Sequence, residues 1–336
     1  MLEPTENVSD DRAQLARVQR PVSDDLQEMQ RQFVAALSSD IPIVQEVGTH
    51  LLRVGGKRFR PTLMLLVAHL GKSEPRERIR AAAAVELTHT ATLVHDDVMD
   101  RCTVRRGLPT VNARWNDRVS LMMGDFLYSK AFALLAELGC SQLMERLAVC
   151  THRMSVGEML QLEQRGRLEI TEQQYTLMVG EKTASLFGAS CHMGAVLGGQ
   201  DGEGRRRWEA FGESLGLAFQ IIDDVFDFVG QERVLGKPVG NDLREGHATL
   251  PLIGALERSP ARARAGILEL IHRGEHLNGR WDEVVAFVRD HGGIELAQER
   301  ANQYVRQARE ALDSGARSPH LEALSLAVDY VIDRVR

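Results

Sequence analysis

Two clusters of aspartates, far apart in the chain, share one spacing. Each places carboxylates at positions i, i+1 and i+4, which an α-helix turning about 100° per residue brings to one side. The six residues are Asp96, Asp97, Asp100, Asp223, Asp224 and Asp227. Acids this close repel one another, and the apolar residues that lead into both clusters supply no balancing charge. Facing clusters could instead hold magnesium ions, with substrate phosphates completing the coordination.

Basic residues recur near glycines and near the first acidic cluster. In segment 55–61 two glycines precede Lys57 and Arg60, which suits an anion that approaches the backbone closely. Arg105 and Arg106 follow the first cluster, where adjacent arginines can grip phosphate or close a salt-bridge network. Further candidates are Lys182, Thr183 and Lys237, the last in a Gly-rich loop at 230–246. Each segment alone is common on surfaces, but the whole set indicates a diphosphate bridged by magnesium.

Composition excludes several classes of function. The 336 residues carry a net charge of −6 without a basic block, so nothing indicates nucleic-acid binding. No apolar run approaches the ~20 residues of a membrane span, and the N-terminus lacks a signal-peptide core. Four widely spaced cysteines form no zinc-type pattern. We therefore expect free thiols in a cytoplasmic protein.

Apolar periodicity predicts that helices position these residues. We expect one all-α domain over 23–336 after a flexible tail at 1–22, because no alternating strand pattern exceeds a few residues. Ser23, followed by two acids, predicts a helix start, and 107–109 is expected to be a loop. Further helices are predicted at 61–70, 77–100, 117–138, 141–165, 171–198, 205–229, 249–257, 261–273, 281–290, 293–313 and 319–334.

Taken in order, these motifs resemble those of the trans-isoprenyl diphosphate synthases, also called polyprenyl synthetases. The motifs lie at 55–61, 95–107, 124–127, 157–161, 181–183, 219–227 and 236–251. The resemblance covers residues from about 50 to about 255. It implies the all-α fold of the isoprenoid synthase type, a single large helical bundle with a central cavity, and a homodimer.

The resemblance also implies a role for each site residue. Three magnesium ions would be held by Asp96, Asp100, Asp223 and Asp227, and the catalytic set would be Asp96, Asp97, Asp100, Lys182, Asp223 and Asp224. An allylic diphosphate would contact Arg105, Lys182, Thr183, Gln220 and Lys237. Isopentenyl diphosphate would contact Lys57, Arg60, His89 and Arg106. One departure is His247, at a position where the family often has lysine, so a cationic contact there is in doubt.

The implied reaction is ionisation of the allylic diphosphate followed by head-to-tail addition of isopentenyl diphosphate, without a side-chain nucleophile. His95, beside Asp96, is expected to orient the site rather than to act as a base. Three other functions remain open: a geranylgeranyl or farnesyl diphosphate synthase, a terpene cyclase, and a non-catalytic subunit of a heteromeric synthase. The second aspartate cluster and the isopentenyl-binding bases favour a synthase.

Product length depends in this family on the residues four and five positions before the first aspartate. Here these are Thr92 and Ala91, which are small enough to leave the tail pocket open, as is Thr88 one turn earlier. Phe126 or Phe132 on the next helix could close the pocket at greater depth. We expect a product of C20 or longer, with C30–C50 favoured, and we expect Ala91→Phe to shorten it.

Overall fold

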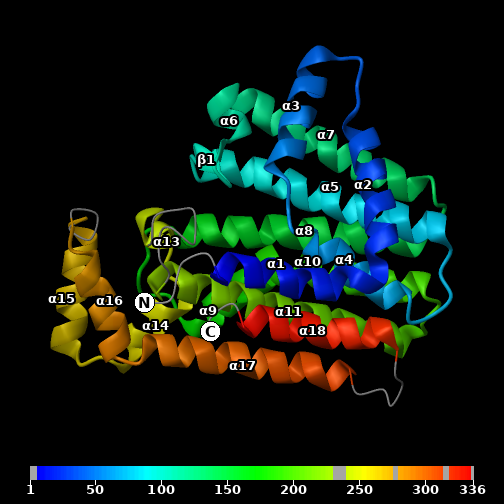
Figure 1. Ribbon diagram of the computed structural model, residues 1–336. Coiled ribbons are helices and arrows are strands. Elements are labelled where there is room, and N and C mark those ends of the chain that lie inside the picture. Colours follow the sequence, from blue (N-terminus) through cyan, green and yellow to red (C-terminus); the bar gives the residue numbers. More distant parts are fainter. Residues whose placement is uncertain (1–5, 230–239, 275–278, 313–317, 334–336) are drawn as a thin grey trace.

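The computed structural model describes residues 6–229, 240–274, 279–312 and 318–333, and it confirms the predicted all-α fold (Figure 1). The N-terminal half comprises α1 (Glu6–Gln19), η1 (Arg20–Val22), α2 (Ser23–Leu37), α3 (Pro42–Val54), α4 (Phe59–Ala68), α5 (Pro75–Met99), β1 (Val104–Arg105), β2 (Leu108–Pro109), α6 (Val111–Arg114), α7 (Asp117–Ala136) and α8 (Ser141–Gln164). The C-terminal half comprises α9 (Glu172–Val179), η2 (Gly180–Ala184), α10 (Ser185–Leu197), α11 (Gly202–Val229), α13 (Asn241–Arg244), α14 (Leu250–Arg258), α15 (Ala261–His272), α16 (Trp281–Asp290), α17 (Gly293–Leu312) and α18 (Pro319–Asp333).

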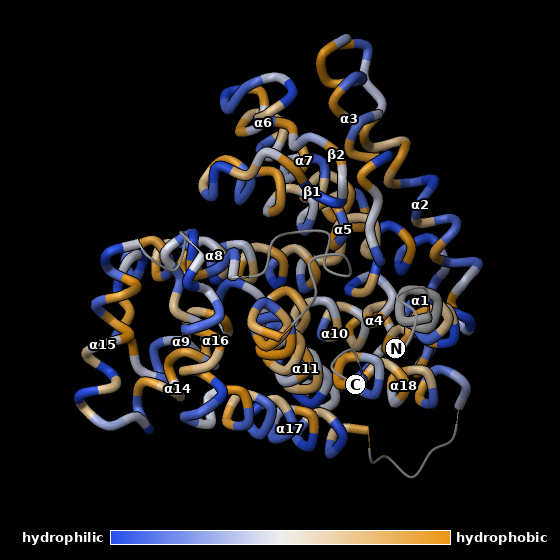
Figure 2. Tube along the Cα trace, turned by 60° about the vertical axis from the view of Figure 1, so that its left-hand side comes forward, coloured by the Kyte–Doolittle hydropathy of each residue, from blue (hydrophilic) through white to orange (hydrophobic). Residues whose placement is uncertain are grey.

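Long helices surround the centre of the molecule. α10 packs against α4, α8 and α11, α5 packs against α7, and α11 packs against α17 (Figure 1). The outer helices α2 and α17 alternate between hydrophilic and hydrophobic residues (Figure 2). Such helices bury one face and leave the other in water. The inner helices α5 and α11 therefore carry the two acidic clusters, and the outer helices α2 and α17 cover them.

Glycines allow the two central helices to approach each other. A Cβ on Gly212 of α11 would lie 2.4 Å from the carbonyl oxygen of Phe187 on α10. A Cβ on Gly216, one turn later, would lie 2.7 Å from Cα of Ala184. Such contacts are closer than real side chains tolerate, so the absence of Cβ atoms lets α11 bring the second acidic cluster near η2.

The predicted flexible tail at 1–22 is wrong for residues 6–22, which form α1 and η1. Leu15, Val18 and Val22 are buried, and α1 lies beside α18 from the other end of the chain (Figure 1). The apolar residues of this segment are few, and their partners are distant in sequence. Tertiary packing supplies the burial that the local pattern does not predict.

Two local details also differ from expectation. The expected loop at 107–109 instead belongs to a two-stranded hairpin over 104–109, in which Val104 pairs with Pro109. Arg106 and Gly107 form its turn, both with positive φ, as the tightest hairpin turns require. The single helix predicted at 171–198 is divided into α9, the π-helical η2 and α10. Both irregular segments carry predicted site residues.

α7 is long and apolar enough to cross a membrane by length and composition, a run that the sequence expectation overlooked. A third of its most apolar window is buried. Core helices of soluble proteins also meet this criterion, and α7 packs against α5. The four cysteines are free thiols, as expected.

Candidate active site

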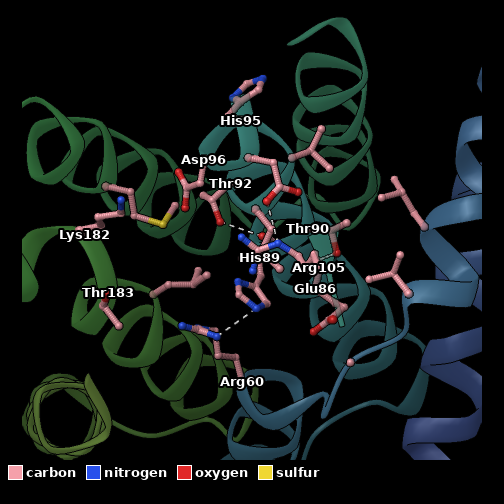
Figure 3. Close-up of a pocket in the computed structure, with 18 of the residues that line it drawn as sticks. Arg60, Glu86, His89, Thr90, Thr92, His95, Asp96, Arg105, Lys182 and Thr183 are labelled. Carbon is pink, nitrogen blue, oxygen red and sulfur yellow. Dashed lines mark hydrogen bonds and ion pairs between the residues drawn. The ribbon is translucent and has the colours of Figure 1, made fainter. Parts of the chain in front are cut away.

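One large cavity, of about 690 Å³, brings members of both acidic clusters together. Asp96 and Asp223 line it together with lysines and arginines from three other segments of the chain. Figure 3 shows Asp96 with Arg60, Arg105 and Lys182 from these segments. The predicted site residues among its walls are Lys57, Arg60, His89, Thr92, Asp96, Asp97, Arg105, Arg106, Lys182, Thr183, Gln220 and Asp223. Its remaining walls are largely apolar, so charged groups and apolar side chains line the same cavity.

A smaller cavity of about 170 Å³ adjoins the first, because Lys182, Thr183 and Gln220 line both. Asp100 and Asp224 line only the smaller cavity. Members of each acidic cluster are therefore divided between two adjacent cavities. Lys237 lies outside the described residues.

Asp96 and Lys182 form the charged wall of the large cavity (Figure 3). Burial raises the pKa of Asp96 to about 7, against the opposing charge of Lys182. Lys182 Nζ is 2.5 Å from Glu158 Oε2 on α8. Burial lowers the pKa of Lys182, but Asp96 and Glu158 outweigh it, so this pKa lies above its usual value. One ammonium group thus serves two carboxylates, which leaves room for a further cation.

The backbone around Lys182 is π-helical, a conformation that occurs often at functional sites. This π-helical segment packs closely against α8, because a Cβ on Gly157 of α8 would lie 2.3 Å from Lys182 N. The bulge and the glycine together place Lys182 and Thr183 in the wall of both cavities. Thr183 Oγ1 in turn donates to Gln220 Oε1 on α11 at 3.2 Å.

Asp97 also lines the large cavity, and it is paired with a base. Its Oδ1 accepts a hydrogen bond from Arg105 Nε at 2.8 Å, and the pair fixes the hairpin against α5. Burial raises the pKa of Asp97 above its usual range in spite of Arg105. Arg105 also lines the cavity, where its other N–H donors can bind a phosphate. Asp97 is thus placed to orient a phosphate-binding arginine.

Two carboxylates of the second cluster, Asp224 and Asp227, accept hydrogen bonds from other parts of the protein. Asp224 accepts hydrogen bonds from Tyr175 Oη at 2.6 Å and from Gln220 Nε2 at 2.9 Å. Burial raises the pKa of Asp224 above its usual range, although both hydrogen bonds act in the opposite direction. Asp227 accepts from the backbone N–H groups of Asn241 and Asp242, at 3.2 and 3.1 Å. Metal binding by Asp227 stays a prediction, and its two hydrogen bonds also hold α13 in place.

A basic pocket lies at the other side of the cavity. Arg60 Nη1 donates to His89 Nε2 at 3.2 Å (Figure 3). Burial, followed by the charge of Arg60, holds the pKa of His89 well below its usual value, so the imidazole is neutral and can accept this bond. Burial lowers the pKa of Arg60 to about 10, so it stays charged at neutral pH. Its Nε is buried and lacks a hydrogen-bond partner among the described residues.

Two further arginines complete this pocket. Arg58 is paired with Glu86, which is 3% exposed, so its charge is largely neutralised. Arg106 donates to the carbonyl oxygen of Gly55 and closes the glycine turn over the cavity. Among the residues that the structure describes, neither Arg60 nor Arg106 forms an ion pair with a carboxylate as Arg58 does, so the pocket has a net positive charge and suits a diphosphate.

His247 cannot replace a lysine as a cation at neutral pH. Burial, then Lys182 and Arg165, lower its pKa to about 4. Its Nε2 is 3.0 Å from Gln161 Nε2, and it lies close to Asp100 and Glu245 in the smaller cavity. The doubt raised by the sequence therefore has a physical basis.

Comparisons with known proteins agree with this geometry. The sequence profile described as polyprenyl synthetase matches residues 41–288. The chain belongs to the polyprenyl synthetase family. It is 35% identical to an all-trans-nonaprenyl-diphosphate synthase (geranyl-diphosphate specific) of Rhodobacter capsulatus, over 94% of this chain and 97% of that protein. It is 37% identical to a short chain isoprenyl diphosphate synthase of Methanothermobacter thermautotrophicus, over 85% and 88%. The crystal structure of a Caulobacter crescentus polyprenyl synthase, complexed with calcium and isoprenyl diphosphate, superposes with a TM-score of 0.89 at 34% identity, over 95% and 97%.

As a member of this family the protein is a prenyltransferase, and its acids fit a divalent cation. Carboxylates that are buried with too few bases are the oxygen donors that magnesium prefers. Asp96 shows this shortage of positive charge in its raised pKa. The partnerless Nε of buried Arg60 equally fits an anionic oxygen.

Of the four residues predicted to determine product length, Thr92 is the one that lines the large cavity (Figure 3). Ala91 and Thr88 are fully buried in the helix packing, and Phe132 packs against the core outside the cavity walls. Ala91 is 0% exposed because its side chain packs against neighbouring helices, whereas Thr92, the next residue on α5, borders the cavity. On α7, the large side chain of Tyr128 lines the cavity.

Sequence reasoning missed several residues that this synthetase uses to position its site. They are Asp11, Glu86, Tyr128, Tyr175 and Tyr330. Most contact a predicted residue from a distant part of the chain, so no spacing could reveal them. Glu158 had a signal, because it falls within the motif at 157–161.

Proposed function

We propose that this polyprenyl synthetase adds isopentenyl diphosphate to an allylic diphosphate and forms a trans-polyprenyl diphosphate of C20 or longer, in the C30–C50 range. The observation that carries the proposal is one cavity with acids from both clusters, an uncompensated basic pocket and apolar walls. It supports two diphosphate sites beside a space for a hydrocarbon chain. The relatives' names cover both long and short products, so they support the reaction more strongly than the length.

Each group of residues has one task in this proposal. Asp96, Asp100 and Asp223 would hold magnesium, which when bound supplies positive charge to the departing diphosphate. Arg105, Lys182, Thr183 and Gln220 bind the allylic diphosphate. Arg60, His89, Arg106 and Lys57 bind the diphosphate of isopentenyl diphosphate. The apolar walls keep water away, because water would capture the allylic cation before the second substrate attacks it.

Product analysis tests the proposal. The purified chain is incubated with magnesium, labelled isopentenyl diphosphate and a geranyl, farnesyl or geranylgeranyl primer, and the dephosphorylated products are separated by length. We expect labelled C30–C50 products, no product from Asp96→Asn, and normal products from the surface variant Asp290→Asn. A clean C15 product would contradict a length of C20 or more, and a clean C20 product would contradict the C30–C50 range.

The same assay separates the other functions. A cyclised hydrocarbon without incorporation of label would indicate a terpene cyclase, for which the basic pocket around Arg60 has no use. Inactivity without a partner chain would indicate a subunit of a heteromeric synthase. The intact acids of both clusters favour a chain that is active by itself.

A homodimer in the cytoplasm belongs to the same proposal. Apolar side chains remain exposed on α7 and α8, among them Met122 at 63% and Met159 at 67%. Large exposed apolar residues on adjacent helices are typical of a surface that a partner covers. Because Met159 also lines the large cavity, a second copy there would close one of its walls.

A further inference from the structure

Lys57 is held between the two ends of the chain. Its Nζ is 2.8 Å from Asp11 Oδ2 on α1 and donates to Tyr330 Oη on α18 at 2.8 Å. Lys57 and Tyr330 line the large cavity, and α1 and α18 lie side by side (Figure 1). An N-terminal helix therefore reaches a lysine that the proposed function assigns to isopentenyl diphosphate.

α1 is anchored independently of this ion pair. Leu15 and Val18 are buried, and Gln19 Nε2 donates to the carbonyl oxygen of Lys57 at 2.8 Å and to Thr62 Oγ1 at 3.2 Å. Asp11 therefore sits at the rim as part of a docked helix. The carboxylate itself is not needed to hold α1 in place, so its charge can act on the lysine alone.

The ammonium group has three donors, and these two contacts use two of them. A diphosphate could take the third, but Asp11 would then share one cation with an anion of two or more charges. Like charges on opposite sides of one ammonium repel over a short distance. The ion pair itself is weak, because the side chains of Lys57 and Asp11 are 44% and 30% exposed. Repulsion of the incoming diphosphate thus outweighs any gain from holding the lysine still.

We propose that Asp11 sets the affinity for isopentenyl diphosphate by competing with its diphosphate for Lys57. This inference rests on the proposed function, in which Lys57 belongs to the isopentenyl subsite. The allylic subsite is built from other residues, Arg105 and Lys182 among them, so Asp11 weakens the binding of one substrate and leaves the other unaffected.

Steady-state kinetics of Asp11→Asn test this inference. We expect the KM for isopentenyl diphosphate to fall about threefold to tenfold, while the KM for the allylic substrate changes less than twofold. Asp40→Asn is the matched control, because it removes one exposed negative charge away from the cavity and should change neither constant. An unchanged or raised KM for isopentenyl diphosphate in Asp11→Asn would overturn the inference.

A double-mutant cycle checks that Asp11 acts through Lys57. In the Lys57→Gln background, Asp11→Asn should lose most of its effect on that KM, and an equal effect in both backgrounds would overturn the route through the lysine. Thermal unfolding confirms that each variant is folded. If the wild type incorporates no isopentenyl diphosphate, the proposed function itself fails. Normal wild-type turnover with no shift in Asp11→Asn contradicts only the role of Asp11.

Discussion

The raised pKa of Asp96 indicates that this buried carboxylate needs a further positively charged partner. Its burial is greater than the nearby positive charge can compensate, and Lys182 is shared with Glu158. Asp97 and Asp224, in the same two motifs, bind Arg105 and Tyr175 instead. Side chains with identical spacing in the sequence therefore have different tasks, according to what lies opposite each one.

The raised pKa of Asp96 predicts a pH-dependent affinity for metal. Asp96 must lose its proton to bind Mg²⁺, so below its pKa of about 7 the affinity should fall by up to about tenfold per pH unit. The measurement is the rise in Tm on adding Mg²⁺, which we expect to be larger at pH 8 than at pH 6. Asp96→Asn should remove most of this difference, and Asp290→Asn should keep it. An equal rise at both pH values in the wild type would contradict the assignment.

Gly124 on α7 is predicted to be essential for the position of the His95 side chain. A Cβ there would lie 2.1 Å from His95 Nε2, which also contacts the carbonyl oxygen of Leu121 at 3.0 Å. Gly124→Ala gains about 1 kcal/mol of helix propensity, but displacing the imidazole beside Asp96 costs about 1–3 kcal/mol. We expect a lower Tm and lower turnover. Gly266→Ala, where nothing lies within 4 Å, should keep or raise the Tm. A stabilised, fully active Gly124→Ala would show that the contact does not matter.

At the scale of the element, α5 presents Thr92 to the cavity and Ala91 to the core. Thr92→Phe should shorten the product while the enzyme still turns over, because the ring enters the space for the growing chain. Ala91→Phe, expected from the sequence to do this, should instead lower stability by overpacking, typically by about 1–3 kcal/mol. Product length and Tm are measured for both variants. Unchanged products in Thr92→Phe would place the length determinant elsewhere, with Tyr128 the next candidate.

Asp25 of α2 joins several helices through one carboxylate. It accepts from Arg78 Nε on α5 at 2.7 Å and lies 2.6 Å from His69 Nε2 after α4. Burial opposes these contacts, but they lower the pKa of Asp25 to about 2. A depressed acid pKa adds stability above the unfolded value near 4, and this stability is lost as the pH falls toward 2.

This contact predicts an acid-sensitive contribution of about 2 kcal/mol to the free energy of unfolding. Denaturant unfolding from pH 6 to pH 2 measures it. Asp25→Asn should lower stability at pH 6 and flatten the decline between pH 4 and pH 2. Its exposed neighbour Asp24 provides the control, because Asp24→Asn should keep the wild-type slope. Parallel curves for wild type and Asp25→Asn would refute the linkage.

At the scale of the whole molecule, the exposed apolar side chains on α7 and α8 predict self-association. Met122→Lys places a charge on this surface and should shift the mass in solution from dimer to monomer, as measured by light scattering. Leu177→Lys makes the same change at a 55% exposed residue of α9 and should leave the dimer intact. A wild-type monomer would contradict the proposed dimer outright.

The sequence determined the helical class, because helical periodicity is a local property of the chain. The resemblance to the family implied the central cavity, and acid spacing predicted which carboxylates would lie near it. The sequence also placed the start of α2 at Ser23. It did not predict α1, because the burial of Leu15 and Val18 comes from distant helices. Tertiary structure alone assigned Asp97 to Arg105, Thr92 to the cavity and Asp11 to Lys57. Each of these depends on which distant side chain lies opposite, and spacing along one helix carries no record of that.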